Sequence, residues 1–255
     1  MQQLPKITII TPSYNQGKFL EQTILSILNQ NYPNLEYIVM DGGSDDNSRD
    51  IIEKYKNQFS YWISEPDNGQ ADAISRGFQR STGDILAYIN SDDYYFTGSL
   101  MKIANIFLNN SSVQWVVGQG HFIDEQGNLM KKTKYPSITM DNMLYLENCV
   151  FQPSTFWSRD LYFSAGGINP KYSFAFDYDL FLRFLERAPP EVTHEEIAYF
   201  RIHSCSKTST ISSTGAKENA CIRKDFFLRN GIKEKPILKL MGNIYRKTAF
   251  IYNWL

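Results

Sequence analysis

The sequence predicts an α/β protein with a Rossmann-like, mostly parallel central sheet flanked by helices. In residues 1–95, short apolar runs alternate with stretches of helical periodicity, which indicates parallel strands joined by crossover helices. Polar clusters follow these runs, at the sheet edge where open α/β proteins bind ligands. The run from Ile85 to Ile89, which leads directly into Asn90-Ser91-Asp92-Asp93, combines both observations.

The N-terminal half gives the clearest elements. Strands are expected at residues 6–11, 35–40, 61–65 and 85–89, with Pro12 closing the first, and helices at 18–30 and 70–80. Ser44 or Asp45 is placed to cap a further helix that carries Ile51, Ile52 and Tyr55. This alternation is the basis for predicting parallel strands.

The pattern changes after Asp93. Helices are expected at residues 98–108 and 177–187, and a basic, aromatic helical segment begins at about Lys217. Strands are expected at 113–117, 119–124, 129–132, 152–157 and 197–202, with a hairpin turn at 126–128. The C-terminal half should therefore be a mixed structure rather than a repeat of the first half.

Composition excludes several classes of protein. The 255 residues carry a net charge of −1, which gives no sign of a nucleic-acid partner. The three cysteines lack metal-type spacing and are expected to be reduced thiols, and neither a signal peptide nor a run of ~20 apolar residues is visible. A cytoplasmic protein, soluble or peripherally attached to the inner face of the membrane, is expected. The loop after the first strand has one glycine where a dinucleotide site needs three, which argues against a dehydrogenase.

Four polar clusters fall at strand ends or turns, and each alone is weak evidence. They are 11–15 (Thr-Pro-Ser-Tyr-Asn), 41–46 (Asp-Gly-Gly-Ser-Asp-Asp), 65–73 (Glu-Pro-Asp-Asn-Gly-Gln-Ala-Asp-Ala) and 90–93 (Asn-Ser-Asp-Asp). Later motifs are 152–156 (Gln-Pro-Ser-Thr-Phe), 176–183 (Phe-Asp-Tyr-Asp-Leu-Phe-Leu-Arg) and 200–203 (Phe-Arg-Ile-His). In this order and spacing the set resembles the family 2 glycosyltransferases of the GT-A fold, from about Ile7 to His203.

The resemblance implies a GT-A domain at residues 1–212, with a nucleotide-sugar half (1–95) and an acceptor half (96–212), followed by a C-terminal helical extension (213–255). Thr11, Pro12 and Tyr14 would line the base pocket, and Asp41 would accept a hydrogen bond from the base or ribose. The remaining residues expected at the donor are Asn15, Asp67, Gln70, Asp72, Asn90, Ser91 and Asp92. For Asp72, a helix N-terminal charge favoured by the helix dipole is an equal alternative.

A divalent cation, Mn²⁺ or Mg²⁺, is the cofactor that the resemblance implies. Asp92 and Asp93 correspond to the family's Asp-x-Asp metal motif, although Asn90 stands where a further Asp is common. Such hard cations prefer oxygen ligands and bridge to phosphates, which suits a site with few carboxylates. His203 resembles the family's late His that contacts metal or diphosphate, but a purely structural histidine is the alternative.

The reaction that the resemblance implies is inverting transfer of a sugar, from a UDP-sugar donor, to a hydroxyl of a glycan or lipid-linked acceptor in bacterial surface polysaccharide synthesis. Inversion in one displacement needs a single base on the acceptor side. Asp177 matches the Asp of the family's Glu-Asp motif, with Phe176 replacing the Glu; Asp179 competes with it, and a helix N-cap is the alternative role for Asp177. Gln152, Arg159 and Arg183 are expected to position acceptor or diphosphate, unless Arg183 pairs with Asp179 at i, i+4.

Two other functions stay open on the sequence. A sugar nucleotidyltransferase could use a similar sheet and metal site, but it would need a Gly-rich, basic loop after the first strand, and residues 11–17 contain neither Lys nor Arg. A catalytically inactive sugar-binding homologue is the second alternative, because Asn90 and Phe176 both depart from the family pattern.

The tail carries apolar and aromatic residues among basic ones, which is typical of an interfacial membrane helix and also of a terminal helix packed on its domain. The apolar and aromatic residues are Ile237, Leu240, Met241, Ile244, Tyr245, Phe250, Ile251, Tyr252, Trp254 and Leu255, and the basic ones are Lys233, Lys235, Lys239, Arg246 and Lys247. Peripheral membrane contact through this helix is therefore one of two expectations.

Overall fold

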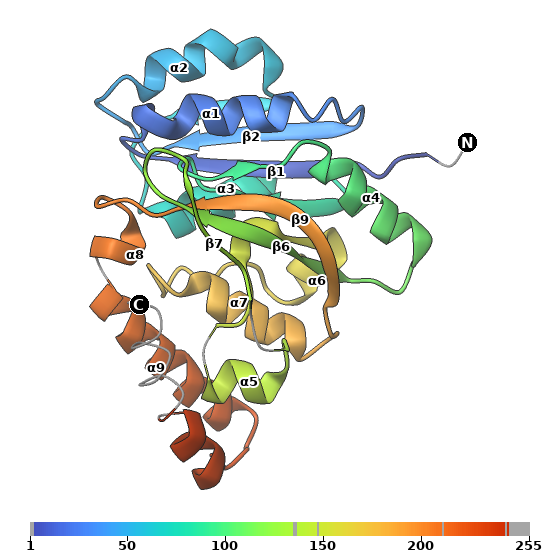
Figure 1. Ribbon diagram of the computed structural model, residues 1–255, viewed down its shortest axis with the longest axis vertical. Helices are drawn as coiled ribbons and strands as arrows, with labels where there is room; N and C mark the ends of the chain where they lie inside the picture. The colour runs from blue at the N-terminus through green and yellow to red at the C-terminus, as the bar shows by residue number, and fades with distance from the viewer. Residues whose placement is uncertain (1–2, 135–136, 147, 211, 243, 245–255) are drawn as a thin grey trace.

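The computed structural model describes residues 3–134, 137–146, 148–210, 212–242 and 244. In this part of the chain a 9-stranded mixed sheet carries helices on both faces (Figure 1). The strands are β1 (Ile7–Ser13), β2 (Leu35–Asp41), β3 (Tyr61–Ser64), β4 (Ile85–Tyr88), β5 (Tyr94–Tyr95), β6 (Trp115–Ile123), β7 (Leu129–Lys132), β8 (Thr155–Ser158) and β9 (Glu191–Arg201). The α-helices are α1 (Gly17–Leu28), α2 (Ser48–Tyr55), α3 (Gln70–Arg80), α4 (Ser99–Asn109), α5 (Met140–Tyr145), α6 (Arg159–Ser164), α7 (Phe176–Leu185), α8 (Lys207–Thr210) and α9 (Ser212–Arg229).

The strand order is β3-β2-β1-β4-β8-β6-β9-β5, with β7 paired to β6. The first four strands in this order are parallel, which confirms the predicted N-terminal half. β8 joins β4 in antiparallel fashion, and the remaining strands form the mixed part of the sheet. The carboxyl ends of β1, β2 and β4 consequently meet at one edge.

The first strand does not stop at Pro12 as predicted but continues to Ser13. The pairing of β1 with β4 ends at Ile10, whereas its pairing with β2 extends to Ser13. Proline is tolerated in a strand where it faces no neighbour on its nitrogen side. The strand can therefore carry Pro12 and deliver the next residues further along the sheet edge.

The predicted cap of α2 is wrong. The N-cap residue is Asn47, and the Ser44 hydroxyl and N–H are both bonded to the Asp41 carboxylate instead. Ser44 therefore fixes the loop after β2, whereas the prediction placed it at the start of the helix.

The C-terminal half differs from the prediction in several places. The two strands expected at 113–117 and 119–124 form the single strand β6, with irregular pairing around Gly118 and Gly120. Residues Gln152–Ser154 form a 3₁₀ turn rather than the start of a strand, with Pro153 inside it. β9 begins earlier than expected, at Glu191, because its polar first half occupies an exposed part of the sheet. The short elements β5, α5, α6 and α8 were not predicted, and α9 begins at Ser212, earlier than the expected start at about Lys217.

Two apolar cores lie on opposite faces of the sheet. Helices α1, α2 and α4 cover one face through residues such as Leu20, Ile52 and Ile103. Helices α3, α5, α6, α7 and α9 cover the other, around Trp157 and Phe181. Helix α9 belongs to this second core through Ile222 and Phe226, so part of the segment expected as an extension packs with the main body. The proposed division at residue 212 stays a prediction.

Candidate active site

The loops that follow β1, β2, β3 and β4 are hydrogen-bonded to one another. The Asn15 N–H donates to the Ser44 hydroxyl at 2.8 Å, and the Asp45 N–H donates to Asn15 Oδ1 at 3.0 Å. Gln70 Nε2 donates to Asn90 Oδ1 at 2.5 Å and so joins the start of α3 to the loop after β4. Four clusters that are separate in the sequence thus form one continuous edge.

Asp41 is held rigidly within this edge. Its side chain is buried and accepts hydrogen bonds from the Ser44 N–H and hydroxyl at 2.9 and 2.5 Å, and from the Ser64 hydroxyl at 2.7 Å. Asp67 lies close by, because a Cβ atom added to Gly42 would be 2.9 Å from Asp67 Oδ2. The predicted donor residues Asp41 and Asp67 are therefore neighbours.

The end of β1 and the loop that follows it are partly buried. Thr11 is fully buried, and its hydroxyl accepts a hydrogen bond from the Tyr37 hydroxyl at 3.1 Å, so this hydroxyl faces the core rather than a base pocket. Pro12 is buried as well, whereas Tyr14 has 62% of its surface exposed. Of the three residues expected at the base, Tyr14 is the one with a ring available to a ligand.

Asp72 has a local structural partner. Its carboxylate accepts the Asn68 N–H at 3.1 Å and lies in the first turn of α3, as the helix-dipole alternative predicted. This contact orders the turn that precedes α3 and leaves a role at the donor as a prediction.

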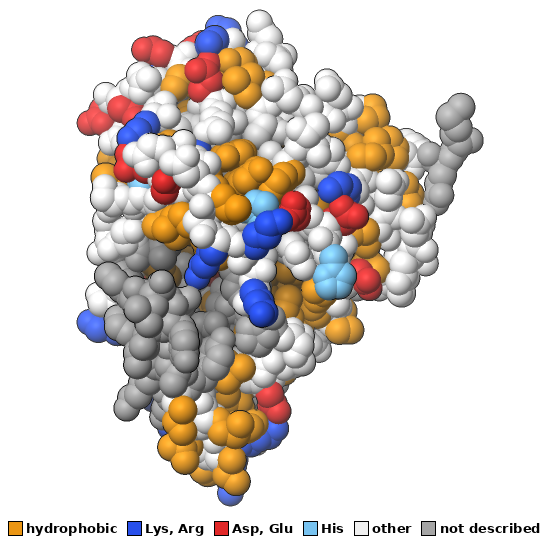
Figure 2. Space-filling view, viewed as in Figure 1, with side chains coloured by type: hydrophobic (Ala, Val, Ile, Leu, Met, Phe, Trp, Pro, Cys, Tyr) orange, Lys and Arg blue, Asp and Glu red, His pale blue; other side chains and the backbone are white. Residues whose placement is uncertain are grey.

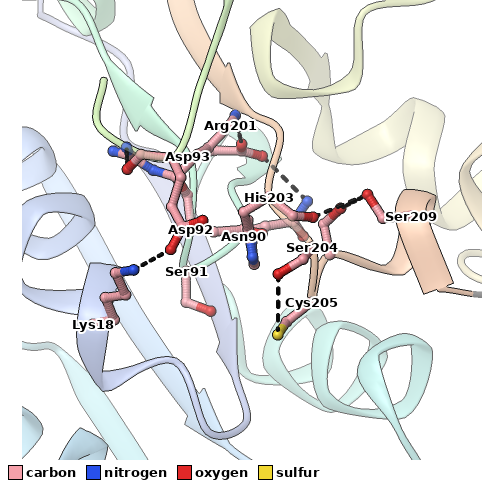
Figure 3. A network of polar contacts seen from close by, with 12 residues as sticks. Lys18, Asn90, Ser91, Asp92, Asp93, Arg201, His203, Ser204, Cys205 and Ser209 are labelled. Atoms are coloured by element: carbon pink, nitrogen blue, oxygen red, sulfur yellow. Dashed lines mark hydrogen bonds and ion pairs between the residues drawn. The ribbon is translucent and has the colours of Figure 1, made fainter. Parts of the chain in front are cut away.

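The two carboxylates after β4 have different environments (Figure 3). Asp92 Oδ2 lies 2.9 Å from His203 Nε2, and the Asp92 side chain is 15% exposed. Asp93 is buried; its Oδ1 accepts the Arg201 N–H at 2.9 Å and its Oδ2 accepts Asn90 Nδ2 at 3.3 Å. Burial and the neighbouring Asp92 raise the pKa of Asp93 well above its ordinary value. Asp92 is therefore the more accessible of the two carboxylates, and Asp93 faces the protein interior.

Arg201 connects the elements around this pair. Its Nε donates to the Asp92 carbonyl at 3.0 Å, its Nη1 to the Glu125 carbonyl at 2.9 Å and its Nη2 to Gln22 Oε1 at 2.6 Å. The guanidinium also lies 4.8 Å from the centre of the Phe19 ring. No role for Arg201 was predicted, although it stands in the Arg-Ile-His motif.

The residues present fit a divalent cation that takes most of its ligands from phosphate and water. Asp92 and His203 lie side by side and could give a metal one oxygen and one nitrogen ligand. The Ser91 carbonyl accepts the Thr23 hydroxyl at 2.9 Å and so fixes the same loop. Within the described ranges there is no group of three or more His, Cys, Asp or Glu side chains that could hold a metal. Mg²⁺ and similar ions commonly use one or two protein carboxylates plus substrate phosphates.

The acceptor-side candidates Asp177 and Asp179 lie in the first turn of α7, and their surroundings differ. Asp179 is buried and accepts Arg183 Nε at 3.0 Å and Nη2 at 2.7 Å, as the pairing alternative predicted. Asp177 is partly buried and accepts the Tyr178 N–H at 2.7 Å. The N-cap of α7 is Ala175, so the capping role considered for Asp177 is wrong.

Burial raises the pKa of Asp177 to about 6, against the lowering effects of the Tyr178 N–H and the Lys207 charge. Burial lowers the pKa of Lys207, and the Glu218, Asp177 and Asp67 carboxylates oppose that change. Lys207 thus lies within electrostatic reach of both the donor-side Asp67 and the acceptor-side Asp177. Lys207 and Glu218 were missed because they lie outside every recognised motif.

Gln152 and Arg159 have structural partners. Gln152 Nε2 donates to the Tyr88 carbonyl at 2.8 Å and so supports the end of β4. Arg159 donates from Nη1 to the Ser81 carbonyl, and its N–H donates to the Asp84 carbonyl at 2.9 Å. These carbonyls precede β4, at the edge opposite Asp92, and this placement contradicts the predicted role of Arg159.

Comparison with known proteins agrees with this geometry. The model of the family described as glycosyl transferase family 2 matches residues 8–165, which is more than half of the chain. The chain belongs to glycosyl transferase family 2. It is 32% identical to an uncharacterized glycosyltransferase of Haemophilus influenzae over 213 residues, covering 81% of this chain and 83% of the relative. It is 27% identical to an uncharacterized glycosyltransferase of Nostoc sp. over 275 residues, covering 96% and 82%.

Solved structures of glycosyltransferases show the same GT-A fold. S. aureus TarS 1-349 in complex with UDP-GlcNAc superposes with a TM-score of 0.63 at 18% identity, covering 80% of this family 2 chain and 61% of that chain. A mannosyltransferase, PcManGT from Pyrobaculum calidifontis in complex with GDP-Man and Mn²⁺, gives a TM-score of 0.64 at 16% identity, covering 94% and 70%. The predicted fold class and the resemblance to family 2 are confirmed.

Proposed function

We propose that this family 2 enzyme is an inverting, metal-dependent glycosyltransferase that transfers a sugar from a nucleotide diphosphate to a hydroxyl of a glycan or lipid-linked acceptor. The observation that carries the proposal is the presence of two separate carboxylate positions. Asp92 lies beside His203 on the donor side, and Asp177 lies on α7 with a pKa raised to about 6. A base with a pKa near the working pH is best suited to accept a proton.

In this reaction the acceptor hydroxyl gives its proton to Asp177 while its oxygen forms a bond to the anomeric carbon. The bond from that carbon to the diphosphate oxygen breaks, and its electron pair leaves with the nucleoside diphosphate. Asp92 and His203 would hold Mn²⁺ or Mg²⁺, which when bound supplies positive charge beside the diphosphate. Tyr14 offers a face to the base, Asp67 is the carboxylate proposed to contact the donor, and Asp41 holds the loop beside it.

The donor is proposed to be a UDP-sugar or a related nucleotide sugar, since similar structures hold UDP-GlcNAc and GDP-Man. Release of nucleoside diphosphate is measured for both compounds, with Mn²⁺ and with chelator. Slow hydrolysis of one of these two nucleotide sugars is expected in the presence of Mn²⁺ and not in the presence of chelator. Transfer of labelled pyrophosphate into nucleoside triphosphate, with release of sugar 1-phosphate from the nucleotide sugar, would instead indicate a nucleotidyltransferase, and binding without turnover an inactive homologue.

We further propose that the chain touches the inner face of the membrane through its C-terminal segment, where a lipid-linked acceptor in surface polysaccharide synthesis would lie. Among helical residues 236–242, Ile237, Leu240 and Met241 are 74%, 62% and 56% exposed, while Leu238 packs against the core. Figure 2 shows apolar side chains gathered at this lower end of the molecule, with basic side chains beside them. In the described ranges, no helix is both long and apolar enough to cross a membrane.

The apolar side chains are expected to supply most of this contact. Lys235 pairs with Asp141 at 2.9 Å and Lys239 with Glu234 at 2.6 Å, which reduces the charge available to anionic lipid. Burying three half- to three-quarters-exposed aliphatic side chains would contribute roughly 3–6 kcal/mol. The other residues of the expected anchor (Tyr245, Arg246, Lys247, Phe250, Ile251, Tyr252, Trp254 and Leu255) lie outside the described residues.

A matched pair of variants tests the membrane proposal. Leu240→Gln/Met241→Gln removes apolar surface from the C-terminal segment, and Leu129→Gln/Met130→Gln removes two residues of β7 that are each 56% exposed. Co-sedimentation with phosphatidylserine-containing vesicles should fall for the first pair and stay at the wild-type level for the second. Equal binding by all three proteins, or by none, would show that the segment is structural.

A further inference from the structure

The carboxylate of Glu218, on α9, reaches across to the start of α7. It accepts the N–H groups of Ser173 at 2.9 Å, Phe174 at 2.9 Å and Ala175 at 2.8 Å, and the Ser173 hydroxyl at 3.0 Å. Burial would raise the pKa of Glu218, but these hydrogen bonds lower it below its ordinary value. One side chain from the C-terminal segment thus binds three consecutive peptide groups of another element.

These three peptide groups lead directly into the helix that carries Asp177. The N-cap residue Ala175 has a methyl side chain that can bind no N–H group of the helix. Glu218 instead holds the segment that enters α7, because its partners are the N–H groups of Ala175 and of the two residues before it. Because Asp177 is two residues beyond Ala175, the orientation of its side chain depends on how this first turn is held.

We propose that Glu218 is a positioning residue that fixes the first turn of α7 and thereby the direction of the Asp177 carboxylate. This inference rests on the proposed function, in which Asp177 is the base. It makes α9 part of the site, although Glu218 lies in the C-terminal extension expected from the sequence. A displacement of about 1 Å at a reacting group can cost on the order of 100-fold in rate.

The chain offers a matched control on the same helix. Asp225 accepts Lys171 Nζ at 2.9 Å and the Tyr172 hydroxyl at 3.1 Å, so it binds the same loop just before the three N–H groups. Asp225→Asn weakens the attachment of α9 to this loop but leaves the start of α7 bonded to Glu218. Glu218→Gln keeps one acceptor oxygen but replaces the other with an NH₂ group, which cannot accept a hydrogen bond from a peptide N–H. The variant therefore loses part of the contact with the three N–H groups.

The experiment measures release of nucleoside diphosphate from UDP-GlcNAc and GDP-Man with Mn²⁺ for Glu218→Gln, Asp225→Asn and Asp177→Asn. Glu218→Gln should lower kcat by roughly 10- to 100-fold with an unchanged KM for the donor. The kcat of Asp225→Asn should stay within about twofold of the wild type. If the loss in Glu218→Gln came only from loosening of the loop, Asp225→Asn would lose kcat as well. Hydrogen exchange at residues 173–175 should accelerate in Glu218→Gln and not in Asp225→Asn, a readout that needs no turnover.

Three outcomes would overturn the inference. Wild-type kcat in Glu218→Gln together with an inactive Asp177→Asn would refute the positioning role and leave the base assignment intact. Equal losses in Glu218→Gln and Asp225→Asn would show that both residues only stabilise the loop. An active Asp177→Asn would refute the base assignment in the proposed function, and the role of Glu218 with it.

Discussion

Replacing Asp177 with Asn is expected to remove most of the turnover and, at neutral pH, to make the protein more stable. The substitution keeps the size of the side chain and an oxygen that can accept the Tyr178 N–H. It removes the negative charge that burial disfavours and that a base requires. Donor affinity should be retained, and turnover should fall on the order of 10²–10⁴-fold, the usual contribution of a positioned base.

The expected gain in stability follows from the pKa of Asp177, which burial raises from 3.8 to about 6. A group with a raised pKa binds its proton more tightly in the folded state, so its ionised form opposes folding. This cost is absent below pH 3.8 and complete above pH 6. About two pKa units correspond to about 3 kcal/mol at pH 8, and to about half of that at pH 5. The helix dipole favours the anion by only about 0.3–1 kcal/mol and is the smaller effect.

Urea denaturation of wild type and variant between pH 5 and pH 8 measures this difference. The advantage of Asp177→Asn should grow as the pH rises from 5 to about 6 and then level off. Asp179→Asn is the control, because it leaves Arg183 without its partner on the same helix and should lose roughly 3–5 kcal/mol. A variant at position 177 that is less stable than wild type at pH 8, or a difference independent of pH, would refute the reasoning. Retained turnover there, with loss at position 179, would identify Asp179 as the base.

Three further substitutions test the remaining electrostatics. Asp92→Ala should abolish both transfer and the thermal stabilisation by Mn²⁺ plus nucleotide, which is worth about 2.7 kcal/mol when the ligand is at 100 times its Kd. Asp93→Ala should also abolish transfer. Undiminished nucleotide-dependent stabilisation in both variants would contradict the metal assignment. Glu36 is buried at the opposite sheet edge, where burial would raise its pKa but hydrogen bonds from Thr8 and Thr82 lower it from 4.5 to about 2. Glu36→Gln should therefore lose about 3 kcal/mol at pH 7 with donor KM unchanged, and the difference should shrink as the pH falls below 4.5, as acid titration of urea stability can check.

Local periodicity was sufficient to predict the N-terminal half of the fold. The strands at 35–40 and 61–65 and the helix at 70–80 appear as β2, β3 and α3 within about a residue at each end. Because consecutive parallel strands place their carboxyl ends at one edge, the polar clusters after them could also be expected to meet. The polar motifs and the strand topology therefore both indicated the same edge of the sheet as the site.

Contacts between distant segments could not be predicted in this way. Arg201 binds the Asp92 carbonyl, 109 residues away in the sequence, and the backbone near the β6–β7 turn. Glu218 binds the residues just before α7. No periodicity links positions so far apart. The prediction divided the single strand β6 because Gly118 and Gly120 interrupt its apolar pattern. In the structure, Gly120 is part of the strand, where Ala198 and Phe151 approach too closely for a side chain at this position.

The five central aspartates can be distinguished by the groups that satisfy their oxygens. Hydroxyl and N–H donors surround Asp41, peptide and amide N–H groups bind Asp93, and a guanidinium neutralises Asp179. Asp92 is bonded to an imidazole, which can itself serve a metal, and Asp177 accepts a neighbouring N–H with its Oδ1. A carboxylate that several internal donors or a guanidinium hold supports the structure, whereas one with fewer internal contacts can bind a cation or accept a proton. This difference is the reason for assigning chemistry to Asp92 and Asp177 among residues that look equivalent in the motifs.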